Sequence, residues 1–349
     1  METTLALATQ DKQIIVNGTS VTPSISTGAD WRQIVAYFLL SMDVKESSMG
    51  LYKRTITHYF DWIEKTHRTL ANVTEADIKE YKDYLQGTIK DKYRKNFGRE
   101  YFKDYPELKE RNLSALTTGS YLIAVRKFYE FAEAYKLYPN VAKRVKTPHK
   151  RNEFKKHYLH ETEITNLLDY YKEKNLRDFA IVNLILRTGL RTIEVVRANV
   201  EHIDFMEGRR VLKVWGKGHD EPDEIVVLTD EAYEPIKEYL ETYRKGARGT
   251  EPLFTSNSYR VQGERLCTKT ISCLCKEGLK AIGLDSHSYT AHSLRHTTAC
   301  MILKAGGTEF KVQEVLRHSS VNTSLIYMES LKKERRIQEA PEDLLSKMF

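Results

Sequence analysis

The chain lacks any hydrophobic run of the roughly 18 residues that a membrane-spanning helix requires, although 41% of its 349 residues are hydrophobic. Its first residues, METTLALATQDKQ, lack the basic start and apolar centre of a secretory signal peptide. We also find no internal repeat and no low-complexity tract. We therefore expect a cytosolic protein that makes no contact with a membrane.

Cysteine is scarce. The four cysteines are Cys267, Cys273, Cys275 and Cys300, and none of them forms a CxxC pair. Because structural zinc sites usually show such paired spacing, we predict reduced, mostly buried thiols and neither a metal ion nor another cofactor. A metal site that joins some of these thiols to His287 or His296 is the alternative.

The excess of one charge sign is small, since 55 Lys and Arg face 48 Asp and Glu for a formal charge of +7. A modestly basic chain is compatible with a polyanionic partner but does not identify one. The length of 349 residues is too great for one small domain and suits two.

Residues 1–28 form an N-terminal extension that is rich in Thr and Ser and carries little charge. Within it, residues 13–16 followed by Asn17-Gly18 predict a small hairpin. The extension has too few basic residues for a DNA-binding arm, so we expect a flexible segment or a partner contact.

From residue 29 to residue 142 the apolar residues recur with a helical period, which predicts a compact α-helical domain. In the second predicted helix, Leu51 and Ile56 are expected to point inward. In the third, Thr74 and Asp77 have the spacing of a capping box. Four helices are expected, beginning near Trp31, Ser48, Thr74 and Thr117.

Residues 88–112, between the third and fourth predicted helices, alternate Lys and Arg with Tyr and Phe. Cations that bind phosphates and rings that stack on sugars or bases suit a nucleic-acid contact. The candidate contacts are Lys92, Arg94 and Lys95. Acidic residues in the same stretch support a solvated, charged loop equally well.

Residues 143–157 are strongly basic and contain Pro148, which discourages a continuous helix. We interpret them as an extended linker that binds DNA phosphates, so that affinity would depend on salt. An ordinary exposed linker is the alternative. The candidate contacts are Lys143, Arg144, Lys146, Lys150 and Arg151.

A second domain is expected over residues 158–330, mainly helical with a small antiparallel sheet. Strands at 210–215 and 224–228 predict a hairpin with Lys217 at its tip. Gly189 is placed to end a helix. The expected helices are 161–173, 176–187, 190–198, 231–244 and 268–281, with another beginning after Thr290.

Several groups suited to phosphodiester chemistry occur in this second domain. His292 and Arg295 are one helical turn apart, so both can face one site. Arginine binds two phosphate oxygens in a planar fork, and fixed cations stabilise the charge that grows when a phosphodiester is attacked. Each residue alone has an ordinary structural interpretation. The motifs follow in the order Thr188-Gly189-Leu190-Arg191 with Glu194, Gly216-Lys217-Gly218, His292 to Thr297, Leu316 to Ser320, and Tyr327.

This order and spacing resemble the tyrosine recombinase (phage integrase) family. The resemblance covers residues 158–330, and the helical domain before them is similar to that family's core-binding domain. It implies a mainly α fold with a small antiparallel sheet, in which a helical core-binding domain and an α/β catalytic domain form a clamp around duplex DNA. One departure is Arg317, where the family usually has glycine. We expect Arg317 to reach DNA or to point into solvent.

The resemblance implies that Tyr327 is the nucleophile, which forms a 3′-phosphotyrosine and releases a 5′-hydroxyl. Lys217 would protonate the leaving oxygen, and His292 would accept the proton of Tyr327. Because the chemistry exchanges one ester for another, it needs no ATP.

The resemblance also assigns the groups that bind the phosphate. Arg191 and Arg295 would bind its oxygens, and His318 would donate a hydrogen bond to it. Glu194 would orient Arg191 or a neighbouring histidine. A metal ion is not required, since the arginines supply the positive charge.

The expected protein is a site-specific DNA recombinase, the integrase of a mobile genetic element, which acts in the cytoplasm on the nucleoid. Its expected partners are double-stranded DNA, three further copies in a tetramer on paired sites, and accessory DNA-bending proteins. Residues 331–349 would pass to a neighbouring protomer or, alternatively, dock on their own domain.

Other functions remain open. A Xer-like resolvase or a DNA invertase is the alternative within the family. Two alternatives come from other classes: a DNA-binding protein that keeps the fold without the chemistry, and a monomeric enzyme similar to type IB topoisomerases.

Overall fold

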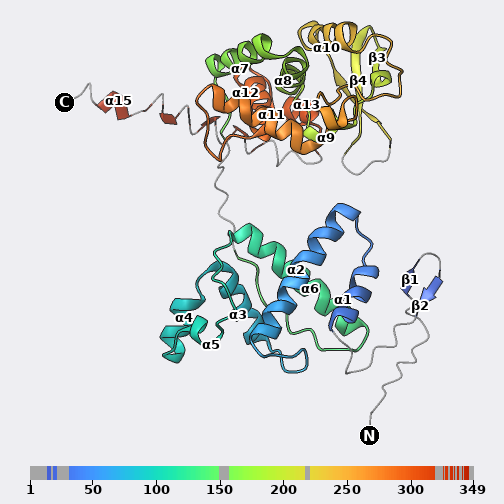
Figure 1. The fold of residues 1–349 in the computed structure, drawn as a ribbon. Coiled ribbons are helices and arrows are strands. Elements are labelled where there is room, and N and C mark those ends of the chain that lie inside the picture. The colour runs from blue at the N-terminus through green and yellow to red at the C-terminus, as the bar shows by residue number, and fades with distance from the viewer. Residues whose placement is uncertain are drawn as a thin grey trace. The chain divides into compact units, whose positions relative to one another are not determined.

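The computed structural model of the protein describes residues 14–16, 19–21, 31–148, 157–216, 221–318 and parts of the chain from 325 to 345. It divides into two compact units, residues 1–152 and residues 153–349 (Figure 1). The predictions about Lys150, Arg151 and Lys217 lie outside the described residues. None of the helices in the described ranges has the length and apolar character needed to span a bilayer.

The first unit is helical, as the sequence predicts, and the small N-terminal hairpin is confirmed: strands β1 (Ile14–Val16) and β2 (Thr19–Val21) pair antiparallel. The four predicted helices are confirmed, with starts that differ by a few residues. The helices of this unit are α1 (Trp31–Leu40), α2 (Glu46–Lys65), α3 (Glu75–Gln86), α4 (Ile89–Phe97), α5 (Tyr101–Asp104) and α6 (Ala115–Ala134).

Helix α3 begins where the capping-box sequence predicts, because the backbone N–H of Thr74 donates to Asp77 Oδ2 at 2.8 Å. The aromatic side chains of α2 form the centre of the core, where Phe60 packs edge-on against Phe128 with ring centroids 5.0 Å apart. The prediction that Leu51 points inward is wrong, since this side chain is exposed. It precedes Ile56 by five residues and so lies about 140° away around the helix.

For residues 88–112 the alternative of a solvated, charged loop is wrong in part, because two segments of this stretch are helices. Residues 89–97 and 101–104 are helical, and Tyr93 and Tyr101 are buried with their rings edge-on at 5.0 Å. Buried rings cannot stack on bases, so these aromatics belong to the core. Lys92, Arg94 and Lys95 are all exposed, and Lys92 forms an ion pair with Asp83 at 2.7 Å.

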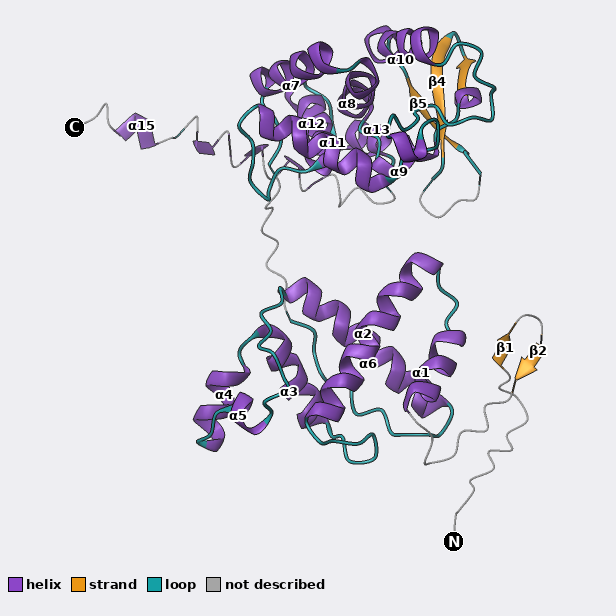
Figure 2. Ribbon diagram, viewed as in Figure 1, coloured by secondary structure: helices purple, strands orange, loops and turns teal. Residues whose placement is uncertain are grey.

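The second unit is mainly helical with one small antiparallel sheet, which confirms the predicted fold class (Figure 2). The strands lie in the order β3 (Ile203–Met206), β4 (Arg209–Val214) and β5 (Glu224–Val227). The helices are α7 (Glu161–Lys174), α8 (Leu176–Thr188), α9 (Thr192–Arg197), α10 (Asp230–Tyr243), α11 (Thr268–Ala281), α12 (Ala291–Lys304) and α13 (Glu309–Leu316), with a short α15 at Glu342–Leu345.

Strand β3 is absent from the sequence-based prediction, which contains only the β4–β5 hairpin. The turn that joins β3 to β4 is Glu207-Gly208, and both residues have positive φ, 49° and 71°. Two such residues form the tight turn whose twist matches a β-hairpin. The Glu-Gly pair was therefore a usable signal for the missing strand.

Helix α8 is the central element of the second unit, since it packs against α7, α10 and α12 (Figure 1). Its residues from 180 to 186 are all buried, as expected of a helix that is covered on several sides. It ends at Gly189, as predicted, and so delivers the next residues of the chain to the site described below.

The prediction of mostly buried thiols holds for only two of the four cysteines. Cys275 and Cys300 are buried, whereas Cys267 and Cys273 are exposed. Cys267 directly precedes α11. Cys273 lies on the outer face of α11, where the amphipathic pattern places polar residues.

We predict that Gly189→Ala destabilises the protein more than Gly208→Ala does. Both glycines have positive φ, so either change carries a backbone cost of about 1–2 kcal/mol. An added Cβ at Gly189 would also meet the side chain of Leu316, whereas nothing lies near Gly208. The resulting overpacking adds about 1–3 kcal/mol. Urea unfolding measures both variants, and equal losses would contradict the close approach at Gly189.

Candidate active site

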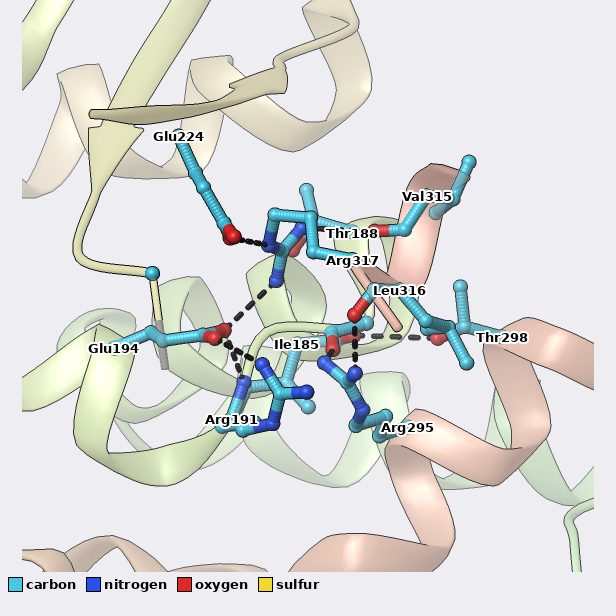
Figure 3. Close-up of polar contacts among 12 residues, drawn as sticks. Ile185, Thr188, Arg191, Glu194, Glu224, Arg295, Thr298, Val315, Leu316 and Arg317 are labelled. Atoms are coloured by element: carbon cyan, nitrogen blue, oxygen red, sulfur yellow. Dashed lines mark hydrogen bonds and ion pairs between the residues drawn. The ribbon is translucent and has the colours of Figure 1, made fainter. Parts of the chain in front are cut away.

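The turn between α8 and α9 holds Arg191 against Glu194. Gly189 closes α8 with a left-handed φ of 64°, and Arg191 precedes the first turn of α9. Glu194 folds back, so that its Oε2 accepts from the backbone N–H of Arg191 at 2.7 Å and its Oε1 accepts from Arg191 Nη1 at 2.6 Å. Figure 3 shows this contact between Arg191 and Glu194. The Glu194 side chain is only 3% exposed, whereas the Arg191 side chain is 28% exposed, so a buried carboxylate holds a guanidinium that solvent still reaches.

Arg295 connects three helices at the same place. It lies on α12, is buried, and donates hydrogen bonds to the backbone carbonyls of Gly189 and Leu316 (Figure 3). Burial and then the charge of Arg191 lower the pKa of Arg295 to about 10. The guanidinium is therefore still charged at neutral pH and adds a second fixed cation beside Arg191.

An open cleft of about 570 Å³ brings Arg191, His292 and Arg295 together at the N-terminus of α12. Thr290 precedes this helix, as the sequence predicts, and its backbone N–H donates to Ser293 Oγ at 3.0 Å. Two guanidinium groups beside the positive end of a helix make a favourable place for an anion. The cleft is also lined by Thr192, Ser272, Lys276, Tyr289 and Thr290.

Tyr327 lies buried beside the histidines of the site. Its ring stacks on His318 with centroids 6.2 Å apart and contacts His296 at 5.0 Å. His296 in turn contacts His292 at 4.5 Å, so a series of rings runs from the cleft to Tyr327. Burial raises the pKa of Tyr327 to about 12, against the lowering effect of Arg295 and Arg191. The phenol is thus protonated at neutral pH and needs a proton acceptor to become a nucleophile.

His318 follows α13 in a turn that is closed by hydrogen bonds. Its N–H donates to the carbonyl of Gln313, and Gln313 Nε2 donates to the carbonyl of His318, both at 3.0 Å. Burial, and then the charges of Arg295 and Arg191, lower the pKa of His318 to about 4. The imidazole is therefore neutral at neutral pH and offers one N–H donor.

The expectation that Arg317 reaches DNA or solvent is wrong. Its side chain is 7% exposed and forms ion pairs with Glu194 at 2.7 Å and with Glu224 at 3.4 Å (Figure 3). The two carboxylates come from α9 and β5, far from residue 317 in the chain. Local sequence therefore carries no signal for this inward orientation.

The remaining predicted residues are placed only in part. Lys217 lies in a stretch that the structure does not describe, whereas Lys143, Arg144 and Lys146 are exposed in the first unit.

The first part of the predicted tail docks on its own domain. Leu331 is buried in the cluster that contains Tyr327, and Glu334 accepts a hydrogen bond from the hydroxyl of Tyr158. Lys304 lies 3.6 Å from the same carboxylate. The segment that follows Tyr327 is thus tied to α12 and to the start of the second unit.

We predict that His318 makes stability fall with acid. Its pKa is about 4 in the folded protein, against an ordinary 6.5, so between these values the unfolded chain binds a proton that the folded chain does not. The free energy of unfolding then decreases as pH falls from about 6.5 to about 4. Thermal melts of the wild type and His318→Gln at pH 7.5 and 5.0 test this. The variant should lose less stability, and equal losses would contradict the lowered pKa.

Residues 157–334 match the family model described as the phage integrase family. The tyrosine recombinase XerC of Leptospira interrogans is 26% identical over 311 residues, which cover 87% of this chain and 89% of that protein. The tyrosine recombinase XerD of Staphylococcus epidermidis is 30% identical over 287 residues, which cover 78% of this chain and 92% of that protein.

The fold is shared with solved structures of low sequence identity. The XerH site-specific recombinase bound to a palindromic difH substrate aligns with a TM-score of 0.66 at 18% identity, over 90% of this chain and 85% of that one. A lambda integrase dimer bound to a COC′ core site aligns with a TM-score of 0.60 at 16% identity, over 85% of this chain and 76% of that one. At these identities the likeness concerns the fold.

Proposed function

The chain belongs to the phage integrase family of tyrosine recombinases, and we propose that it cleaves and rejoins specific DNA sites through a 3′-phosphotyrosine at Tyr327. The observation that carries this proposal is the meeting of Arg191, His292 and Arg295 at one cleft. Tyr327 contacts His296 and His318, and His296 in turn contacts His292. A single site thus holds the cations that a phosphodiester needs and a phenol that can attack it.

In this proposal Arg191 and Arg295 bind the non-bridging oxygens of the scissile phosphate. Both guanidinium groups are held by other parts of the protein, Arg191 by Glu194 and Arg295 by two backbone carbonyls. Cations held in place before the reaction need not reorganise as charge builds up, so they stabilise the pentavalent state more than the substrate. His318, neutral at pH 7, donates its N–H to the same phosphate.

Proton transfers complete the proposed cycle. The Tyr327 oxygen bonds to phosphorus as its proton passes to His292, and the bond to the 5′-oxygen of the next nucleotide breaks. Lys217 gives that 5′-oxygen its proton, so a 5′-hydroxyl leaves. The reverse reaction with a new 5′-hydroxyl rejoins the strand. The scheme uses no metal ion or other cofactor, because the arginines supply the positive charge.

We predict that Tyr327→Phe abolishes covalent attachment to DNA while leaving binding intact. The change removes the nucleophilic oxygen and keeps the ring that packs on His296 and His318. The wild type should form an adduct with a nicked duplex taken from the DNA that flanks its own gene, visible as a shifted band in a denaturing gel. An adduct that persists in Tyr327→Phe would overturn the assignment of the nucleophile.

A wild type that binds this DNA and forms no adduct would favour a protein that keeps the fold without the chemistry.

The biological role depends on which DNA the protein cleaves. We propose the integrase of a mobile element, and the similarity to XerC and XerD supports a Xer-like resolvase as the second candidate. Adduct formation on the DNA at the ends of a mobile element supports the first role. Adduct formation only on a chromosomal site away from such an element supports the second.

We further propose that the exposed basic residues Lys143, Arg144 and Lys146 contact DNA phosphates, as members of a linker that includes Lys150 and Arg151. Arg94 and Lys95 are exposed and suit the same role. Lys92, also a candidate from the sequence, would first have to leave its ion pair with Asp83.

Replacing Lys143, Arg144 and Lys146 together by glutamine is predicted to reduce the dependence of DNA affinity on salt. Each phosphate contact contributes about 0.9 to the slope of log K against log salt, so the slope should fall by about 2 to 3. The control changes Lys79, Lys90 and Lys127 to glutamine, since each already pairs with an acidic side chain. Equal slopes for the two triple variants would show that the linker residues do not contact DNA phosphates.

We propose that the protein acts in the cytoplasm on the nucleoid, as a tetramer on paired sites with accessory DNA-bending proteins. Because Leu331 and Glu334 dock in their own domain, the segment proposed to pass to a neighbour is residues 341–349. Its deletion should leave single-site binding unchanged and reduce the assembly of four protomers in sedimentation. If four protomers still assemble to the same extent, residues 341–349 do not pass to a neighbouring protomer.

A further inference from the structure

Arg317 has an unfavourable backbone conformation at the edge of the active site. It follows α13 with φ 52° and ψ 53°, in the left-handed region. For a residue with a Cβ this conformation costs free energy, roughly 1–2 kcal/mol. Such positions persist where the surrounding contacts hold them, and they concentrate at functional sites. We therefore ask which contacts of the Arg317 side chain hold this conformation.

Two nitrogens of the Arg317 guanidinium donate hydrogen bonds, and the third, Nε, lies only within ion-pair distance of a carboxylate. Nη2 donates to Glu194 Oε2 at 2.7 Å, Nη1 donates to the carbonyl of Val315 at 2.8 Å, and Nε lies 3.4 Å from Glu224 Oε2 (Figure 3). The side chain is buried, so it is not placed to bind DNA phosphates. It joins α9, β5 and the turn that carries His318.

The contact with Glu194 matters most, because it completes the bonding of that carboxylate. Oε1 of Glu194 accepts from the side chain of Arg191, and Oε2 accepts from both the backbone of Arg191 and the side chain of Arg317. A carboxylate bound on both oxygens by charged donors has little freedom to rotate. The orientation of Arg191 thus depends on Arg317 through Glu194.

We infer that Arg317 is a positioning residue for the cleavage reaction, which holds the Glu194 carboxylate so that Arg191 faces the scissile phosphate. The inference rests on the proposed function, because it assigns Arg191 to the phosphate. Glu224 places a second carboxylate 3.4 Å from Nε, so Glu194 is not alone in balancing the charges of Arg191 and Arg317. Neither Arg317 nor Glu224 touches the reacting atoms.

The test is single-turnover cleavage of a nicked duplex at saturating DNA, for the wild type and Arg317→Gly. Glycine accepts the left-handed backbone, so this variant removes the side chain without adding strain. We expect the cleavage rate to fall 10- to 100-fold, as small displacements of a catalytic group typically cause. The Kd for DNA should stay within about threefold, because a positioning residue does not bind DNA.

A double-mutant cycle shows whether Arg317 acts through Glu194. Adding Arg317→Gly to Glu194→Gln should cost less than threefold in rate, since the carboxylate that Arg317 holds is already gone. Arg244→Gly is the matched control, because Arg244 is similarly buried and pairs with Glu251 at 2.7 Å away from the site. It should cleave at the wild-type rate.

Three results would overturn the inference alone: a wild-type rate in Arg317→Gly, a loss that lies in the Kd for DNA, or a full additional loss in the Glu194→Gln background. A lower melting temperature with an unchanged rate counts as the first of these and assigns Arg317 to stability only. A wild type that forms no adduct at all overturns the proposed function and the inference with it.

Discussion

The buried carboxylate of Glu194 is the interaction on which the active site depends. The carboxylate lies between Arg191 and Arg317. Arg295 is near as well, since burial and then the charges of Arg191 and Arg317 lower the pKa of Arg295. Three guanidinium groups in so small a volume repel one another, and buried charges are costly unless they are paired. Glu194 and Glu224 balance that repulsion, so the arginines hold their positions before DNA arrives.

The ends of helices, rather than their middles, place the groups of the site. Gly189 ends α8 and lets the chain turn directly into Arg191, while Arg295 on α12 binds the carbonyl of that same glycine. The end of α13 is bound by Arg295 through the carbonyl of Leu316 and leads into His318. The Arg295 side chain therefore joins α12 to the end of α8 and to the end of α13.

Burial sets the resting protonation of the reacting groups. Tyr327 is protonated and His318 neutral at neutral pH, for the same physical reason: a charged form is disfavoured away from water. The arginines act in the other direction on Tyr327, since they stabilise its anion. A phosphate that enters the cleft would neutralise part of this charge, so proton removal by a neighbouring base is needed at the moment of attack.

Local features of the chain could be predicted because their causes are local. The capping pair Thr74 and Asp77, the helix end at Gly189 and the bounds of α11 follow from spacing and turn chemistry. The burial of Tyr93 and Tyr101 and the inward turn of Arg317 depend on partners from distant segments. Charge and aromatic content suggested surface roles for these residues, and tertiary packing gave them buried ones.

Identifying the residue that becomes joined to DNA would show directly whether Tyr327 is the nucleophile. The covalent adduct would be digested with nuclease and protease, and the modified peptide sequenced by mass spectrometry. We expect a nucleotide attached through its 3′-phosphate to Tyr327. A nucleotide on Tyr289, which lines the cleft, or one attached through a 5′-phosphate would contradict it.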